Sequence, residues 1–164
     1  MSEESEVFGP EELRKYMKAN GIEGEVIEVG SGATSESAAS SLEAPLDSIV
    51  KSVLFMDKNR RPILVIMGGE HKLQQNTFAR LIGCRKIRLA TRDEVLRFTG
   101  YPAGGVPPMG VKQGVRIFVD SKVMRKKMVY AGGGSEKHIL KFDAKILTKL
   151  YPNSFVDLPV MNRD

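Results

Sequence analysis

The chain has 164 residues, 41% of them hydrophobic and 27% charged, with one cysteine and a formal net charge of +5. This length predicts one domain, the lone Cys84 excludes an internal disulfide, and no apolar run reaches the roughly 20 residues that span a bilayer. The acidic start MSEESE does not match a secretory signal or transit peptide, so we expect a cytoplasmic protein with no membrane partner.

The basic residues lie in clusters at residues 58–61, 85–88, 122–127 and 137–138. Such clusters favour a polyanionic partner, most simply nucleic acid, although a solvated basic surface has the same composition. Because tryptophan is absent and aromatic residues make up 7% of the chain, contact with a nucleic-acid backbone is favoured over stacking on bases.

The sequence contains no internal repeat and no linker, so residues 1–164 should form one domain with a frayed tail at residues 1–8. In chain order we expect a helix at 10–20, a strand at 25–30, a helix at 34–42, strands at 51–56 and 62–67, a helix at 73–82, a strand at 86–90, a helix at 92–99, strands at 114–120, 127–131 and 138–142, and a helix at 143–150.

Local signals support several of these assignments. Pro10 stands in the first turn of its helix. The segment PILVIM at residues 62–67 is apolar on both faces, which predicts a central strand. Thr91 and Glu94 have the spacing of a capping box, and Gly100 ends that helix. Since strands outnumber helices and short turns join several of them, we expect an α+β (mixed α/β) fold with a mixed, mainly antiparallel sheet and helices outside it.

Residues 100–114, GYPAGGVPPMGVKQG, contain five glycines and three prolines, and no charged side chain precedes Lys112. Glycine lets the backbone approach another backbone or a ligand closely, whereas proline removes conformational freedom. A loop with both is shaped and partly rigid, and it presents main-chain N–H and C=O groups. We interpret it as one wall of a small-molecule pocket.

Two other motifs have weaker support. The segment VGSGATS at residues 29–35 follows a strand and precedes a helix, as a dinucleotide-binding fingerprint does, but Ser35 replaces the third glycine. A strand-to-helix turn capped by Thr34 or Ser35 explains the same residues. Ser48 and Lys51 match the Ser-x-x-Lys pattern of acyl-enzyme hydrolases, whose companion motifs are missing.

We expect no metal and no cofactor. His71, Cys84 and His138 lie far apart in the sequence, and no HxxxH or CxxC spacing places two ligands together. Spacing alone does not exclude a Ser-His-Asp arrangement, although the two histidines give it little support.

Lys51 begins a strand whose next residues are apolar. It could be an edge lysine with its amine in water, which is the common case. At the end of a strand that faces a glycine-rich loop, it could instead bind a phosphate or an ester. The periodicity of the sequence leaves both readings open.

Several of these segments resemble the YbaK family of aminoacyl-tRNA deacylases, which is related to the editing domain inserted in bacterial prolyl-tRNA synthetase. The matching residues are Lys51-Ser52-Val53-Leu54-Phe55, Gly68-Gly69, Asp93-Glu94-Val95, Thr99-Gly100, Gly104-Gly105-Val106-Pro107-Pro108-Met109-Gly110 and Val115-Arg116-Ile117-Phe118-Val119-Asp120. The resemblance implies a curled, mixed β-sheet or barrel with flanking helices. It also implies hydrolysis of an amino acid wrongly esterified to tRNA, typically alanine or cysteine on tRNA(Pro).

The resemblance further implies where the site lies. The family's essential lysine falls on Lys51, its GxxxP loop on residues 104–108 and its second glycine segment on residues 131–135. We therefore expect Lys51, Gly104 and Gly105 to be catalytic, with main-chain N–H groups polarising the ester carbonyl. The residues expected to bind the substrate are Thr34, Ser52, Val106, Pro107, Pro108, Met109, Gly132, Gly133 and Ser135.

Two positions depart from the family. Pro107 stands where many members have serine, and residues 133–137 lack the usual basic-glycine ending. The expected partner is the acceptor end of a mischarged tRNA, with a synthetase as a further candidate. Two alternatives stay open: a catalytically inactive, tRNA-binding or regulatory homologue, and a small-molecule hydrolase or nucleotide enzyme that acts without tRNA.

Overall fold

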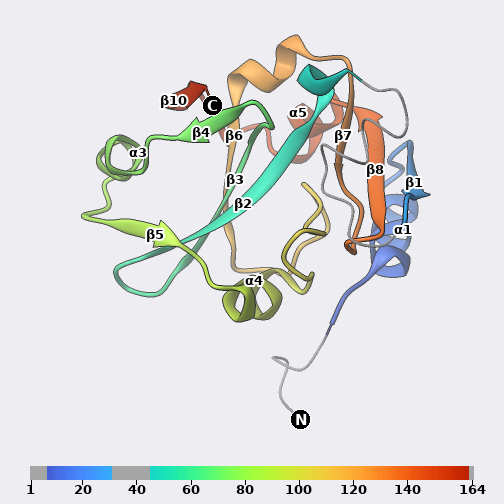
Figure 1. Cartoon of the computed structure of the whole chain (residues 1–164), viewed down its shortest axis with the longest axis horizontal. Helices are drawn as coiled ribbons and strands as arrows, with labels where there is room; N and C mark the ends of the chain where they lie inside the picture. Colours follow the sequence, from blue (N-terminus) through green and yellow to red (C-terminus); the bar gives the residue numbers. More distant parts are fainter. Residues whose placement is uncertain (1–6, 31–44, 163–164) are drawn as a thin grey trace.

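The computed structural model describes residues 7–30 and 45–162 (Figure 1). Its strands are β1 (Gly24–Glu28), β2 (Val50–Asp57), β3 (Pro62–Gly68), β4 (His71–Leu73), β5 (Ile87–Leu89), β6 (Arg116–Asp120), β7 (Met128–Gly132), β8 (His138–Asp143), β9 (Phe155–Val156) and β10 (Val160–Asn162). Its helices are α1 (Pro10–Ala19), α3 (Gln75–Leu81), α4 (Arg92–Thr99), α5 (Ile146–Leu150) and the 3-10 helices η2 (Leu46–Ser48) and η3 (Ser121–Arg125).

The strands form a five-stranded sheet in the order β5-β2-β3-β6-β9, a three-stranded sheet β1-β8-β7 and the short pair β10-β4. The pairings β3–β6 and β6–β9 are parallel and the other pairings between these strands are antiparallel. The structure therefore confirms a mixed, mainly antiparallel sheet in an α+β fold. It also confirms the central position of the strand PILVIM, which is β3.

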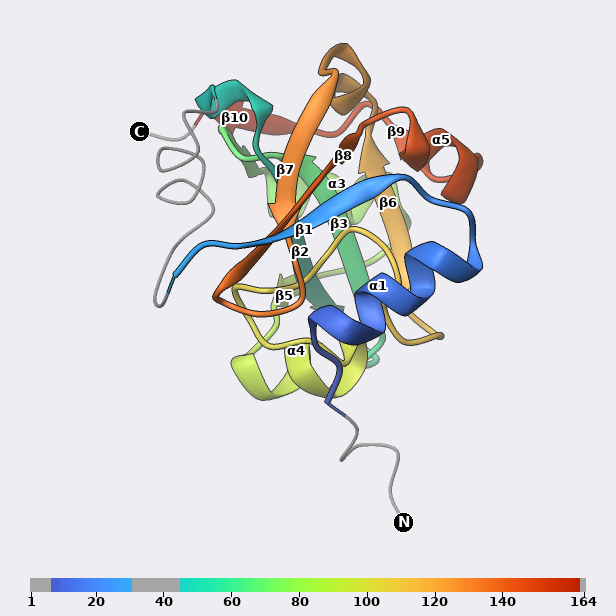
Figure 2. The same ribbon diagram turned by 90° about the vertical axis from the view of Figure 1, so that its right-hand side faces the viewer.

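The two larger sheets meet where β2 begins. Ile49, just before β2, forms a parallel bridge with Tyr130 of β7. From there the two strands diverge, and the segment 100–114 runs between the sheets (Figures 1 and 2). The glycine–proline loop, as we call residues 100–114, is therefore part of the interior rather than a surface connection.

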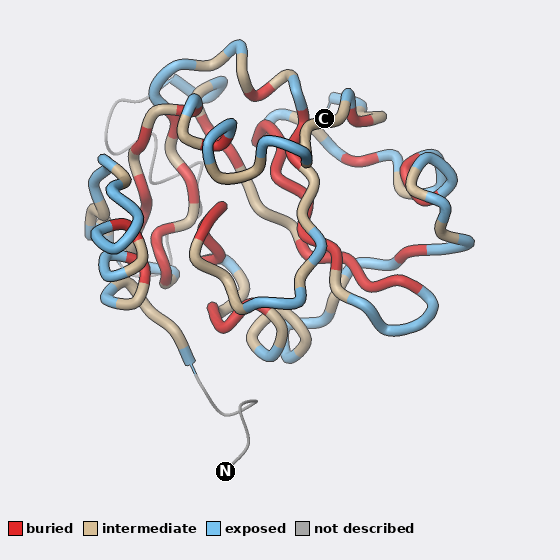
Figure 3. Tube along the Cα trace, turned by 180° about the vertical axis from the view of Figure 1, so that it is seen from behind, coloured by how far each residue is buried: buried red, intermediate tan, exposed pale blue. Residues whose placement is uncertain are grey.

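Side chains on the two faces of β2 belong to different hydrophobic clusters. Val50 packs between the sheets with residues of α1, β7 and β8, and Leu54 packs with Tyr101 and Val106. Phe55, on the opposite face, packs in the cluster that α3 and β4 cover. The buried stretches of the chain follow these strands in Figure 3. The regular alternation fixes which residues of β2 face the glycine–proline loop.

Two predicted helix boundaries were wrong. Leu73 belongs to β4, where it pairs with Val160 of β10, and helix α3 begins only at Gln75. Asp143 ends β8 instead of capping the last helix, which begins at Ile146. In both cases a residue of the predicted helix pairs with a strand instead, Leu73 with β10 and Asp143 with β7. The helix expected at residues 34–42 lies outside the described residues.

Phe8 is anchored rather than frayed. Its amide donates to the carbonyl of Gly100 at 2.6 Å, and its ring stands edge-on to Tyr101 with the centroids 5.5 Å apart. Gly100, as expected, ends α4 with a left-handed φ of 88°. The start of the described chain therefore packs against the beginning of the glycine–proline loop.

The predicted capping box of α4 is confirmed. Thr91 Oγ1 accepts from the amide of Glu94 at 3.2 Å, and the Glu94 carboxylate accepts from the amide of Thr91 at 2.9 Å. Arg88 donates two further hydrogen bonds to that carboxylate, at 2.7 and 2.8 Å. The hydrogen bonds from Arg88 and then from Thr91 lower the pKa of Glu94 to about 2.

We expect Glu94→Gln to reduce the sensitivity of the protein to acid. Because the folded pKa is below the ordinary value of 4.5, Glu94 contributes stability above that pH, and the contribution is lost as the pH falls toward about 2. Urea unfolding between pH 7 and pH 2.5 would measure this. The free energy of unfolding should fall less for Glu94→Gln than for wild type, and an exposed control, Glu23→Gln, should behave like wild type. Equal acid sensitivity of Glu94→Gln and wild type would contradict the assignment.

Candidate active site

The two glycine-rich segments touch each other through their backbones. The amide of Gly134 donates to the carbonyl of Gly105 at 2.8 Å. A Cβ on Gly105 would lie 2.7 Å from backbone atoms of Ser135, and one on Gly132 would lie 2.3 Å from the carbonyl oxygen of Val106. Side chains cannot fit in these contacts, which explains why glycine occupies both positions. The structure therefore brings together the loop and the second segment that the family resemblance placed in one site.

The two segments lie beside the beginning of β2. Ile49 and Tyr130 form the parallel bridge between β2 and β7, and two residues further along the two strands come Lys51 and Gly132. Gly132 is the residue whose backbone contacts Val106. Lys51, Gly132 and the loop are thus close in space although they lie far apart in the sequence.

The main-chain amides of the loop differ in their hydrogen bonding. The amide of Gly105 donates to the carbonyl of Pro102 at 2.9 Å, so this turn already uses it. The amides of Gly104 and Val106 have no acceptor within residues 7–30 and 45–162, and Val106 is only 8% exposed. A buried amide without an acceptor is rare in native proteins. Gly104 and Val106, rather than Gly105, can therefore offer an N–H to a bound group.

Ser52 and Lys51 point to opposite faces of β2. Ser52 shares its face with Val50 and Leu54, and its hydroxyl is buried with no hydrogen-bond partner in the described part of the chain. The ammonium of Lys51, on the other face, donates to the carbonyl of His71, among its interactions. Ser52 therefore faces the loop directly, whereas Lys51 lies at the edge of β2 next to the turn between β3 and β4.

The side chains of the loop itself are mostly core. Val106 packs with Leu54 and Tyr101, and Met109 packs with Val50 and residues of α1. Pro107 and Pro108 are buried, whereas Gly104 is exposed. The loop can thus meet a ligand through the main chain at Gly104 to Val106. That its side chains narrow a pocket stays a prediction.

The second segment contains a Ser–His pair that sequence reasoning passed over. Ser135 Oγ and His138 Nδ1 are 2.7 Å apart, and the amide of Lys137 donates to the same hydroxyl at 3.0 Å. The amide of Gly133 donates to the carbonyl of His138 at 3.1 Å, which closes the turn. Spacing alone, three residues across a glycine-rich turn, could have suggested this pair. Thr34, the remaining expected site residue, lies outside the described residues.

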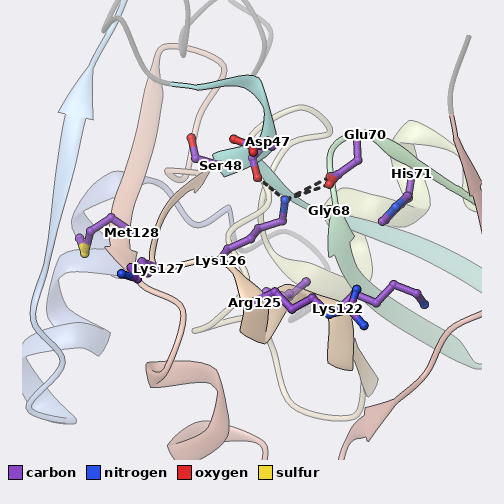
Figure 4. A pocket seen from close by; sticks show the side chains of 11 residues that line it. Asp47, Ser48, Gly68, Glu70, His71, Lys122, Arg125, Lys126, Lys127 and Met128 are labelled. Carbon is purple, nitrogen blue, oxygen red and sulfur yellow. Dashed lines mark hydrogen bonds and ion pairs between the residues drawn. The ribbon is translucent and has the colours of Figure 1, made fainter.

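A charged pocket of about 510 Å³ adjoins the beginning of β2 (Figure 4). Its walls include Glu70, His71 and Lys126, together with residues of the 3-10 helices η2 and η3 such as Arg125. Lys126 donates to the carboxylate of Glu70 at 3.0 Å and to the carbonyl of Asp47. Burial raises the pKa of Glu70, but hydrogen bonds from its own backbone and from Lys126 outweigh this and lower it. Since the carbonyl of His71 accepts from Lys51, this pocket is next to the lysine.

The loop is held in place from the C-terminal part of the chain. Tyr151 Oη, after α5, donates to the carbonyl of Pro108 at 2.9 Å, and burial raises the pKa of this phenol. Tyr101, in the loop, is fully buried, but its hydroxyl has no partner among the described residues. The two tyrosines therefore form a matched pair, one with a hydrogen bond and one without.

We expect Tyr151→Phe to lower the free energy of unfolding by about 1 kcal/mol, because a buried carbonyl loses its donor. The same change at Tyr101 should leave stability unchanged or raise it, because it removes an unsatisfied hydroxyl. Urea unfolding of the two variants would measure the difference. Equal losses would show that the bond to Pro108 does not hold the loop.

Within residues 7–30 and 45–162, no group of three or more His, Cys, Asp or Glu side chains could hold a metal ion. In the same residues, no helix has the length and hydrophobicity needed to cross a membrane. The candidate groups described above are main-chain amides, a serine, a lysine and a Ser–His pair.

Residues 30–150 match the family model of the aminoacyl-tRNA editing domain. A proline–tRNA ligase of Pelobacter propionicus is 30% identical over 68% of this chain, which spans 19% of that ligase. The uncharacterized protein YwhH of Bacillus subtilis is 29% identical over 73% of this chain and 75% of YwhH. A crystal structure described as that of a candidate trans-editing enzyme for prolyl-tRNA synthetase superposes with a TM-score of 0.80 at 26% identity, covering 97% of this chain and 98% of that one.

Proposed function

The chain belongs to the aminoacyl-tRNA editing domain family, and from this membership we propose that it is a deacylase that acts in trans on mischarged tRNA. The reaction is hydrolysis of the ester between an amino acid and the terminal ribose. The observation that carries the proposal is the pair of amides, at exposed Gly104 and buried Val106, that have no acceptor in the described part of the chain and lie where the two glycine segments meet.

These amides suit the chemistry of an ester. Attack of water on the carbonyl develops negative charge on its oxygen, and an N–H positioned for that charge typically contributes about 2.7–4 kcal/mol. In the proposed reaction Gly104 and Val106 donate to this oxygen, and the hydroxyl of Ser52 holds the substrate or the water. An aminoacyl ester is already activated, so the reaction needs neither a metal nor a covalent nucleophile. The neighbouring ribose hydroxyl of the substrate acts as the base that activates the attacking water.

In this proposal Lys51 binds the substrate. Its ammonium holds the phosphate of the terminal adenosine or the polar end of the substrate. A charge-assisted hydrogen bond to phosphate is roughly twice as strong as a neutral one. Because this ammonium lies on the face of β2 opposite the loop, Lys51 binds a part of the substrate away from the ester.

The substrate we propose is tRNA(Pro) carrying alanine or cysteine, because matched relatives are proline–tRNA ligases and a candidate trans-editing enzyme for prolyl-tRNA synthetase. Pockets discriminate one methylene by only about 1–3 kcal/mol, so a synthetase that admits smaller amino acids needs a second, smaller site. In our proposal the side chains of Val106, Pro107 and Pro108, which are buried, limit the space beside the loop amides.

A panel of tRNAs charged with alanine, cysteine, serine or proline tests the proposal. We expect hydrolysis of alanyl- or cysteinyl-tRNA(Pro) and little hydrolysis of prolyl-tRNA(Pro). Binding of tRNA without hydrolysis of any ester would indicate the inactive homologue instead. Turnover of small aminoacyl esters at the same rate with and without tRNA would indicate a small-molecule hydrolase.

A further inference from the structure

A second cationic pocket lies at the opposite end of β2. We call it the hairpin pocket; it has a volume of about 510 Å³ and is lined by Met56, Asp57, Lys58, Arg60, Arg85, Lys86, Ile87 and Arg88. Its walls come from the β2–β3 turn and from the connection between α3 and β5. In Figure 1 both lie at the end of the five-stranded sheet away from β7 and β8. It is therefore separate from the glycine segments.

The cations of the hairpin pocket have few partners. Lys58, Arg60, Arg85 and Lys86 are exposed, and their side chains make no hydrogen bond or ion pair within the described ranges. The carboxylate of Asp57 is already occupied, because it accepts from Asn59 and from the amide and Nε of Arg61 at 2.8–2.9 Å. Burial raises the pKa of Asp57, but these hydrogen bonds outweigh it and lower it.

The charged pocket beside Lys51 differs in this respect. There Lys126 pairs with Glu70 at 3.0 Å, and Lys122 pairs with Asp157 at 2.6 Å and with Asp120 at 3.3 Å. Two of the four lysine and arginine residues that line this pocket, Lys122 and Lys126, are thus in ion pairs. The hairpin pocket, by contrast, presents four cations to an external anion.

The spacing between the site and the hairpin pocket suits an extended anion. Lys51 and Asp57 lie at the two ends of one uninterrupted strand, six residues apart, which corresponds to about 20 Å. Each nucleotide of a stacked strand advances about 3.4 Å along the axis, so this distance covers about six nucleotides. In a tRNA, that distance runs from the esterified 3′ end through its unpaired nucleotides to the first base pairs of the acceptor stem.

We propose that the hairpin pocket binds the phosphate backbone of the acceptor stem while the 3′ ester lies at the glycine segments. This inference rests on the proposed function. RNA is favoured over an acidic protein surface because the lining is dominated by cations around an open concave surface, with few apolar side chains to anchor a protein. These contacts depend on the position of the RNA phosphate backbone and do not distinguish one base from another.

The test is binding of an uncharged RNA hairpin that reproduces the acceptor stem and 3′ end, measured by fluorescence anisotropy at several salt concentrations. The double variants Arg85→Gln/Lys86→Gln and Lys58→Gln/Arg60→Gln remove the cations of the two walls separately. Each should weaken binding on the order of tenfold and lower the slope of log K against log salt by about two. Lys145→Gln/Lys149→Gln, just before α5 and on it, removes the same charge elsewhere and should bind like wild type.

A short single strand with only the unpaired 3′ nucleotides should bind equally to wild type and to both hairpin-pocket variants. Wild-type affinity of both variants for the RNA hairpin would overturn the proposal. So would variants that bind RNA normally but lose binding to a prolyl-tRNA synthetase, since the pocket would then take a protein. Because the RNA carries no amino acid, the result is independent of hydrolysis, and a failure of the deacylation assay would be distinguishable from a failure here.

Discussion

Gly105→Ala should reduce deacylation by about a hundredfold while the protein remains folded. The added Cβ would lie 2.7 Å from the backbone of Ser135, so the two glycine segments must separate. Overpacking of this kind costs typically 1–3 kcal/mol of stability. A displacement of about 1 Å in a reacting group can cost about a hundredfold in rate, and the amide of Val106, next in the chain, would be displaced together with its neighbour.

The matched control is Gly9→Ala. A Cβ on Gly9 would be 3.7 Å from Glu12, an ordinary contact, and φ at Gly9 is −144°. Circular dichroism and urea unfolding would verify that both variants fold, and single-turnover hydrolysis of mischarged tRNA would give the rates. A folded Gly105→Ala variant with the wild-type rate would show that the contact between the segments does not position the loop amides.

Much of the fold could be predicted because its signals are local. The apolar strand β3, the capping box at Thr91 and the stop at Gly100 all depend on residues within a few positions of one another. The density of glycine and proline in residues 100–114 likewise indicated a shaped loop. Each of these predictions concerns a stretch whose conformation the neighbouring residues largely determine.

The parts of the fold that could not be predicted depend on pairings between distant segments. Strands β4, β9 and β10 have two or three residues each, and partners far along the chain stabilise them. The hydrogen bond from Tyr151 to Pro108 spans 43 residues and has no motif. No local pattern distinguishes such residues from others of the same type, so the sequence could not reveal them.

The same limit applies to the candidate site. Sequence reasoning identified the loop as a source of main-chain donors, but it could not tell that the amide of Gly105 is used within a turn and those of Gly104 and Val106 are not. Alternation places Ser52 and Lys51 on opposite faces of the strand, but the sequence could not tell which face meets the loop, because that depends on distant segments. The types of residue at the candidate site were predictable, but their hydrogen bonds and orientations were not.

Lys51→Met should lower kcat/KM for mischarged tRNA by roughly 10-fold to 150-fold. Methionine keeps the aliphatic part of the side chain and removes the ammonium, which in our proposal binds phosphate or the polar end of the substrate. A hydrogen bond from a charged group contributes about 1.5–3 kcal/mol, and 1.4 kcal/mol corresponds to tenfold. The loss should appear mainly in KM if the ammonium binds substrate and transition state equally, and in kcat if it acts only in the transition state.

The control must separate this local role from the general attraction of tRNA to a basic protein. Lys72→Met removes the same charge from an exposed position on β4, one residue from the carbonyl that Lys51 contacts. Its effect should be small and should vanish at high salt, because exposed charges are screened beyond about 10 Å at 0.1 M salt. The effect of Lys51→Met should persist there, since the group is partly buried against the turn between β3 and β4. If Lys51→Met retains wild-type kinetics at both salt concentrations, the lysine has no part in the reaction, and the loop amides and Ser52 would have to position the ester without it.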